Sequence, residues 1–151
     1  MEEKVINEKG VIREFDTVIY PVDIVVAVGD VEEEVNKLYS PENDAYNYIG
    51  RPEKYGATTY RICNKETNDV KVLIWIYSIR EWRSSFIAHE AGHATMEIFR
   101  HIGAGIDYDN QEPFCYLLGT VSRFINKTCH EYVEYLEKNH PKEQEIKFAT
   151  E

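Results

Sequence analysis

The sequence predicts an α+β domain in which a small mixed sheet packs on a helix at residues 86–102 and is followed by a long C-terminal helix. Runs rich in β-branched residues fill the first half of the chain, and helical periodicity fills the second half. With 151 residues, the chain has the length of one domain and can bury a core without staples. We expect one domain over residues 1–151, with loose termini at 1–10 and 141–151.

The first half of the chain begins with residues 18–28, which are dense in β-branched side chains and predict a strand with a bend at its proline. Asp30 and Glu33 have the spacing of an acidic capping box, which predicts a short helix ending near Leu38. Residues 40–56 are polar, rich in tyrosine and interrupted by glycine and proline, so they indicate a long loop.

Two further β-rich runs, residues 58–64 and 70–77, surround a polar turn-like segment. This arrangement is typical of a hairpin. We therefore expect a sheet of three or four strands beside the helix at 86–102. If residues 72–77 form an edge of that sheet, an extended peptide could pair with them by β-augmentation.

The second half of the chain predicts two helices. Ser84 or Ser85 can cap the first, and Gly103 can end it. Its apolar flanks predict that this helix is largely buried. Asp109 or Asn110 can cap the second, which runs from about residue 111 to 139 and places a proline in its first turn. Apolar residues recur on one face of this helix: Phe114, Leu117, Leu118, Val121, Ile125, Tyr132 and Leu136.

The composition excludes several classes of function. Seventeen Lys and Arg against 27 Asp and Glu give a net charge of −10, which argues against nucleic acid and against an anionic membrane surface as partners. No apolar run reaches the length of a membrane span, and the N-terminus lacks the apolar core of a signal peptide. An odd number of cysteines without regular spacing suggests no disulfide framework and a reducing cytoplasm: Cys63, Cys115 and Cys129.

The most specific pattern is the HExxH motif at His89-Glu90-Ala91-Gly92-His93, in the predicted helix at 86–102. Residues four apart lie one turn from each other on the same face of a helix, so both imidazoles can reach one metal ion. A zinc ion with two such nitrogens, a third protein ligand and one water is the arrangement of a hydrolytic site. The motif therefore predicts one Zn²⁺ held by His89 and His93.

Glu112 is the preferred candidate for the third zinc ligand. It opens the last predicted helix, where the helix dipole favours the ionised carboxylate that binds metal. The glycines at 103 and 105 allow the chain to reverse, so the two helices could pack side by side. Asp107 and Asp109 are the alternative ligands.

The chemistry expected of this site is hydrolysis by a metal-activated water. Zinc lowers the pKa of its water from roughly 15.7 to roughly 7, and Glu90 would take the proton as a general base. The donor to the oxyanion stays open among Tyr108, Tyr116, His101 and His130. Glu97, one turn beyond the second histidine, could orient the metal ligands as an outer-shell residue or pair with Arg100.

An HExxH helix after a small sheet, followed by a glutamate on the next helix, resembles the zincin metallopeptidases. Eighteen residues separate His93 from Glu112, which is close to the lower limit of the gluzincin branch. The resemblance implies His89, His93 and Glu112 as ligands and Glu90 as the base, in a minimal zincin-like domain. Residues 89–119 also look like small putative metallopeptidases of phages and mobile elements, which share a Tyr-Leu-x-Gly run, here at residues 116–119.

The chain departs from gluzincins at Tyr116, where that branch often has an aspartate, and it lacks their second subdomain. We nevertheless predict a zinc-dependent hydrolase of peptide bonds that acts on peptides or on a protein partner. The first alternative is a zincin-fold binding or regulatory protein with little or no turnover, as a phage or mobile-element factor. Two others are an amidase acting on a cell-wall peptide and a structural protein whose HExxH is incidental. The oligomeric state is not predicted.

Overall fold

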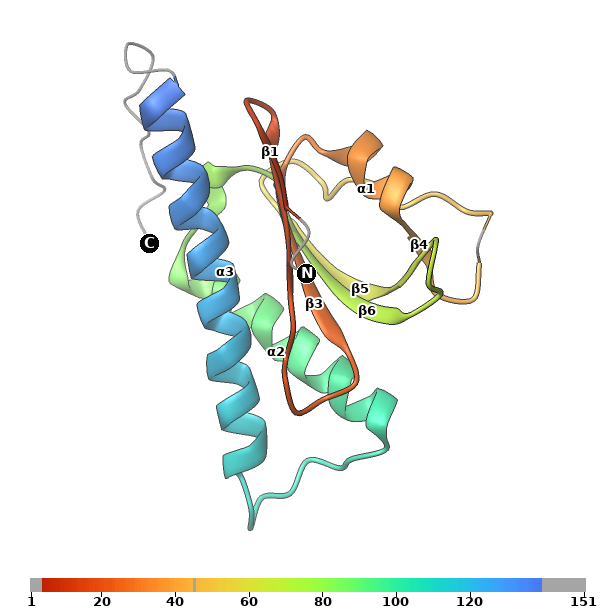
Figure 1. The fold of residues 1–151 in the computed structure, drawn as a ribbon. Helices are drawn as coiled ribbons and strands as arrows, with labels where there is room; N and C mark the ends of the chain where they lie inside the picture. Colours follow the sequence, from red (N-terminus) through yellow and green to blue (C-terminus); the bar gives the residue numbers. More distant parts are fainter. Residues whose placement is uncertain (1–3, 45, 140–151) are drawn as a thin grey trace.

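The computed structural model describes residues 4–44 and 46–139, and they form an α+β fold with a curled, mixed sheet and two packed helices (Figure 1). Six strands make up the sheet: β1 (Lys4–Asn7), β2 (Gly10–Phe15), β3 (Asp23–Gly29), β4 (Tyr39–Pro41), β5 (Ala57–Asn64) and β6 (Val70–Ile76). The helices are α1 (Glu32–Leu38), the 3-10 turn η1 (Ile79–Glu81), α2 (Ser84–Ile102) and α3 (Glu112–Asn139).

The strands lie in the order β1-β2-β3-β6-β5-β4. Only β3 and β6 pair in parallel, and every other neighbouring pair is antiparallel. These two central strands are continuous apolar runs, as expected for strands that are covered on both faces. The predicted hairpin of residues 58–64 and 70–77 is confirmed as β5 and β6.

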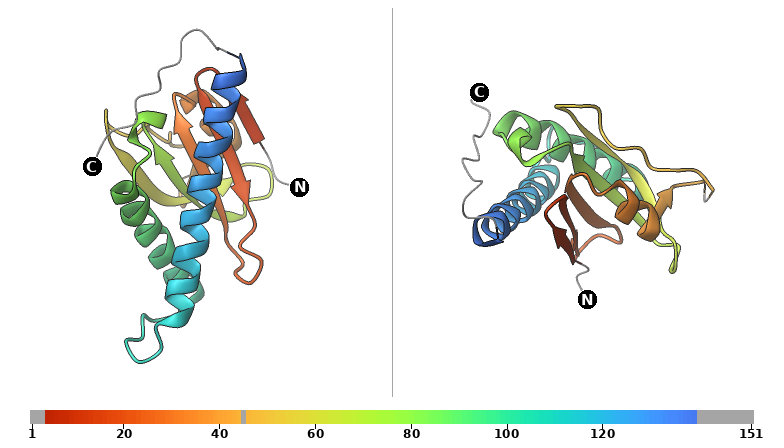
Figure 2. Two further views of the ribbon diagram at one scale, coloured as in Figure 1. Left: turned by 90° about the vertical axis from the view of Figure 1, so that its left-hand side faces the viewer. Right: turned by 90° about the horizontal axis from the view of Figure 1, so that it is seen from above.

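The two faces of the sheet bury separate cores. Alternate residues of β3 and β6, such as Val26 and Ile74, face α2 and α3, whereas Val25 and Trp75 face α1. Figure 2 shows α2 and α3 on one side of the sheet and α1 on the other. The apolar face predicted for the last helix packs in the first of these cores.

The N-terminal hairpin of β1 and β2 was not predicted, and the expectation of a loose segment at residues 1–10 is wrong for residues 4–10. Val5 and Ile6 pair with Ile12 and Val11 across a tight turn. The Asn7 side chain accepts the Lys9 N–H at 2.8 Å, which stabilises that turn. The sheet therefore has six described strands instead of the three or four expected.

The predicted strand at 18–28 begins five residues later than expected, at Asp23. Residues 18–22 form a turn between β2 and β3, in which Val18 has a φ of 70° and is exposed. A β-branched residue in this left-handed region cannot continue a strand. High β-propensity therefore does not make residues 18–22 a strand, because the chain has to reverse there.

The predicted helix ends need small corrections. Helix α1 has Val31, not Asp30, in the N-cap position, and α2 has Arg83 there, not Ser84 or Ser85. Gly103 ends α2 as predicted, with a left-handed φ of 73°. Strand β4 takes up the first two residues of the predicted loop at 40–56, so the connection begins later than predicted.

Helix α3 is 28 residues long and confirms the predicted C-terminal helix. The predicted loose segment at 141–151 lies outside the described residues. None of the helices in the described part of the chain is long and apolar enough to cross a membrane.

Candidate metal centre

The HExxH motif lies in the second and third turns of α2, and its two histidines lie on the flank of the helix that the sheet does not cover. Ala91, Ala94 and Ile98 are buried against the sheet and α3, whereas His89 and His93 are exposed. The expectation of a largely buried helix is therefore wrong for the two histidines. Exposure leaves their ring nitrogens accessible from solvent.

The two imidazoles converge. The Nε2 atoms of His89 and His93 are 3.1 Å apart, and the rings meet nearly edge-on with centroids at 4.7 Å. Two nitrogens bound at about 2.0–2.1 Å to one tetrahedral zinc ion lie about 3.3 Å apart. The spacing of this pair therefore fits two ligands of a single zinc ion.

Glu90 points from α2 toward strand β5. Its side chain is buried, and the Thr59 hydroxyl donates a hydrogen bond to its carboxylate. Because successive residues of a helix are rotated by about 100°, Glu90 lies between the buried flank of α2 and the flank that carries His93. A residue of the sheet thus fixes the direction of the Glu90 carboxylate.

Glu112 does not join the histidines. It is exposed at the start of α3, where it lines a cavity with Thr17, Ile19 and Tyr20 of the β2–β3 connection. Phe114, two residues later, packs edge-on against Phe99 at 5.6 Å between centroids. That contact places the start of α3 about 9 Å further along α2 than His93 by helical rise.

Within residues 4–44 and 46–139, no three His, Cys, Asp or Glu side chains are gathered so that they could hold one metal ion. The alternative ligands Asp107 and Asp109 are exposed in the α2–α3 connection, where the Asp107 carboxylate accepts the Asp109 N–H at 2.9 Å. The described residues thus bring two of the three predicted ligands together. A ligand role for Glu112, Asp107 or Asp109 stays a prediction.

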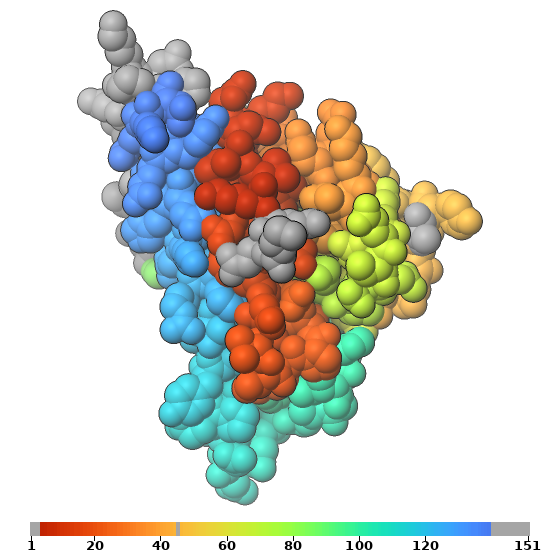
Figure 3. Space-filling model, viewed as in Figure 1, coloured from red at the N-terminus to blue at the C-terminus, as the bar shows by residue number. Residues whose placement is uncertain are grey.

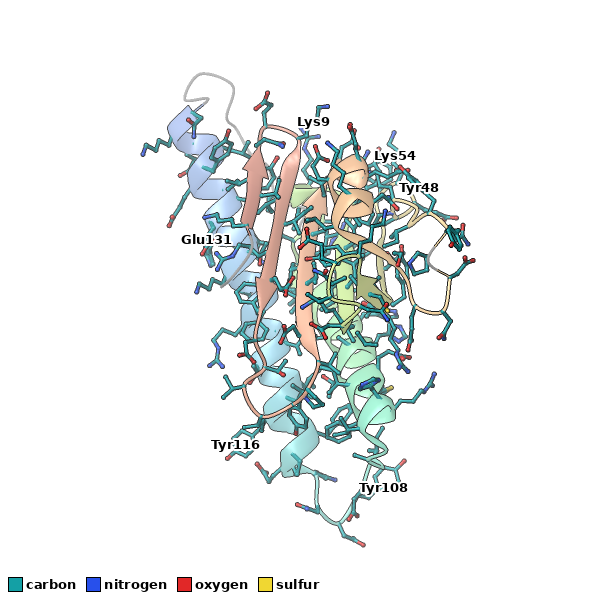
Figure 4. All side chains as sticks on the ribbon, turned by 45° about the vertical axis from the view of Figure 1, so that its right-hand side comes forward. Lys9, Tyr48, Lys54, Tyr108, Tyr116 and Glu131 are labelled. Atoms are coloured by element: carbon teal, nitrogen blue, oxygen red, sulfur yellow. The ribbon has the colours of Figure 1, made fainter. Side chains whose placement is uncertain are left out.

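The residues considered as oxyanion donors lie in different places. Tyr108 and Tyr116 are exposed at the end of the molecule formed by the α2–α3 connection (Figure 4). His101 Nδ1 lies 2.8 Å from an Arg61 nitrogen, and the ring of His130 packs edge-on against Trp82. Among the described residues, none of these four side chains makes a hydrogen bond to His89 or His93.

Glu97 is half-buried one turn beyond the second histidine and pairs with Arg100 at 3.5 Å. The sequence had left open an ion pair with Arg100 or support of the metal ligands. The observed contact is the ion pair. A role in supporting the ligands stays a prediction.

Strand β4 is the edge strand next to β5, and β6 lies between β3 and β5. Residues 72–77 therefore do not form the sheet edge that pairing with a peptide would require. β4 covers only the second half of β5, where Tyr39–Pro41 pair with residues 62–64. No described strand pairs with the outer side of Ala57–Tyr60, the half of β5 that contains Thr59.

Sequence reasoning missed the residues of β5 that contact α2. Thr59 reaches Glu90, and Arg61 reaches both His101 and Glu42, the last at 2.8 Å. Thr59 and Arg61 are two residues apart and so lie on the same face of the strand. The sequence does not indicate which helix covers that face. These contacts depend on tertiary packing.

Comparison with protein-family models, with curated proteins and with solved structures finds no match to this chain. The function proposed below is therefore supported by the geometry of the site and by the motif.

Proposed function

We propose that this protein is a zinc-dependent metallopeptidase with a minimal zincin-like domain. His89 and His93 would bind the metal, and Glu90 would act as the general base. The observation that carries the proposal is the 3.1 Å distance between the two Nε2 atoms. A hydrogen bond between two exposed imidazoles would contribute little to stability, whereas a shared metal ion uses both lone pairs.

Glu90 is the proposed base. It follows His89 directly, and the hydroxyl of Thr59 fixes its carboxylate instead of leaving it free in solvent. A fixed carboxylate close to a metal-bound water loses less conformational entropy when it accepts the proton. When bound, zinc would supply a water of lowered pKa and a Lewis acid for the substrate carbonyl.

The free half of β5 offers a place for an extended peptide. The Arg61 carbonyl faces outward, because it accepts the Glu42 N–H at 3.3 Å, whereas the Gly56 carbonyl faces β6 and accepts the Tyr77 N–H at 2.9 Å. Since backbone groups alternate in direction along a strand, those of Ala57 and Thr59 also face outward. A peptide that pairs with them would run past Glu90 and the histidines.

The third protein ligand stays part of the proposal. Glu112 is its candidate from the motif spacing, and it would have to come from α3. Substitution by alanine tests this role separately: loss of zinc from Glu112→Ala would support it, and full zinc retention would leave a two-histidine site completed by solvent or substrate.

The experiment that tests the proposal combines zinc content with hydrolysis of an internally quenched peptide library. Glu90→Gln should retain zinc and lose at least about a hundredfold in hydrolysis rate, as expected for removal of a general base. His89→Ala and His93→Ala should lose both properties. His101→Ala, which removes an exposed histidine of the same helix, is the matched control for zinc content and should retain zinc.

A second candidate function is a zincin-like metal-binding or regulatory protein without turnover. It is favoured by the absence of a third ligand beside the histidine pair in the described residues. The same experiment separates the two functions. A wild-type protein that binds zinc but hydrolyses no member of the library would overturn the peptidase and support this second function.

A further inference from the structure

One end of the molecule exposes an unusual share of apolar surface. Here the β2–β3 connection (16–22), the α2–α3 connection (103–111) and the first turns of α3 lie together (Figure 3). Six of the ten large apolar side chains that are exposed in the described chain belong to this end. We refer to them as the apolar end: Val18, Ile19, Ile102, Ile106, Tyr108 and Tyr116.

A cavity of about 440 Å³ opens between these elements. Ile19 and Tyr20 line it from the β2–β3 connection, and Pro113, Tyr116 and Leu117 line it from α3. A cavity of this size accepts one or two large side chains. Exposed aromatic and aliphatic side chains around a cavity are typical of protein-binding surfaces.

The turn that presents Val18 and Ile19 is held in place. The Asp16 carboxylate accepts the Val18 N–H at 2.6 Å, and the Thr17 hydroxyl lies 3.0 and 2.9 Å from the carbonyl oxygens of Tyr20 and Val22. These contacts keep Val18 at a φ of 70° with its side chain in solvent. A surface that is ordered before binding loses less entropy when a partner docks.

The charge of this end indicates the kind of partner. Residues 16–22 and 103–120 contain four carboxylates and neither lysine nor arginine: Asp16, Asp107, Asp109 and Glu112. A second copy docked through the same surface would bring like charges together, on a chain whose net charge is −10. An anionic lipid surface is disfavoured for the same reason.

We propose that the apolar end is a docking surface for a partner protein, through an amphipathic segment that combines apolar side chains with lysine or arginine. An apolar side chain of that segment would enter the cavity between Ile19 and Tyr116. Its cations would face Asp107, Asp109 and the neighbouring carboxylates. The part of this surface that α3 forms lies about 9 Å along α2 from His93, by the rise to Phe99. The proposal needs neither bound zinc nor turnover, and its test leaves Glu112 unchanged.

The test uses fluorescence anisotropy with a labelled helical peptide of leucine and lysine, and with the same peptide carrying glutamate in place of lysine. The lysine peptide should bind the full-length protein, and the glutamate peptide should not. Ile19→Ala and Tyr116→Ala should each weaken binding about tenfold. Tyr46→Ala, which removes a fully exposed tyrosine from the loop between β4 and β5, should leave binding unchanged.

The charge contribution is tested with a matched pair of double variants. Asp107→Asn with Asp109→Asn should weaken binding, whereas Glu53→Gln with Glu66→Gln, which removes the same charge from other exposed sites, should have little effect. Equal weakening by the two double variants would show attraction to net charge alone, and wild-type binding by Ile19→Ala and Tyr116→Ala would show that the cavity is not the binding site. Either result would overturn the proposal. Dimerisation of the wild type that Tyr116→Ala abolishes, or binding to phosphatidylcholine vesicles that it abolishes, would also overturn it.

Discussion

The Thr59 hydroxyl donates a hydrogen bond to the Glu90 carboxylate, and this contact joins the free half of strand β5 to the HExxH helix. Of His89, Glu90 and His93, only Glu90 is buried. The contact connects it to the half of β5 with which we propose that a peptide pairs. The sheet, and not α3, therefore holds the Glu90 carboxylate.

Replacement of Thr59 by valine tests this contact. The substitution keeps the shape of the side chain but removes the donor, and it leaves the buried carboxylate of Glu90 with one partner fewer. We expect the free energy of unfolding to fall by about 1–3 kcal/mol, as measured by urea denaturation at neutral pH. Thr120→Val is the control, because the hydroxyl that it removes from α3 has no buried carboxylate as its partner. Equal stability of both variants and the wild type would show that the contact contributes nothing.

The close approach of β2 to the end of β3 should not tolerate a side chain at Gly10. A Cβ atom there would overlap the Val28 carbonyl oxygen and lie 2.8 Å from Cγ1 of Val31. We expect Gly10→Ala to lower the free energy of unfolding by about 1–3 kcal/mol, as overpacking does. Gly119→Ala is the opposite control, because nothing lies within 4 Å of its added Cβ. In the interior of α3 it should raise stability by about 0.5–1 kcal/mol. A neutral Gly10→Ala would contradict the tight packing.

Glu131 should make the stability of the fold depend on pH in the acidic range. Burial acts to raise the pKa of its carboxyl, but the hydrogen bond from Arg13 and the charges of Arg13 and Lys4 outweigh burial and hold the pKa below its ordinary value of 4.5. A depressed pKa in the folded state stabilises the protein above pH 4.5, and that stabilisation disappears as the pH falls through the folded-state value.

The measurement compares urea unfolding of the wild type and of Glu131→Gln at neutral pH and near pH 3. The wild type should be more stable at neutral pH, and the difference should shrink on acidification. Glu137→Gln, an exposed carboxylate of the same helix, should show no such change. A difference between wild type and Glu131→Gln that stays constant over this range would be inconsistent with the ion pair.

Several elements could be predicted because their signal is local. The hairpin of β5 and β6 follows from two β-rich runs around a polar turn, and α2 and α3 follow from helical periodicity and from Gly103. The convergence of His89 and His93 also follows from local geometry, because any α-helix places residues four apart on one face.

The remaining features depend on contacts that are distant in sequence. Val18 and Ile19 have strand-forming side chains but lie in a turn, because residues 10–15 pair with residues 24–29 and the chain must reverse between them. The position of Glu112 depends on which side of α2 the last helix packs. In the structure α3 contacts β2 and β3, whereas α2 contacts β5 and β6. No spacing in the sequence indicates that choice.

The central claim is that His89 and His93 bind one zinc ion together. Zinc K-edge X-ray absorption on the zinc-loaded protein tests it most directly, because the outer-shell scattering of imidazole counts the histidine ligands. The account predicts about one zinc per chain with two histidine nitrogens at about 2.0–2.1 Å, loss of the bound zinc in His93→Ala, and an unchanged spectrum in His101→Ala. Zinc that is absent after loading, or zinc whose histidine count is the same in His93→Ala as in the wild type, would contradict it.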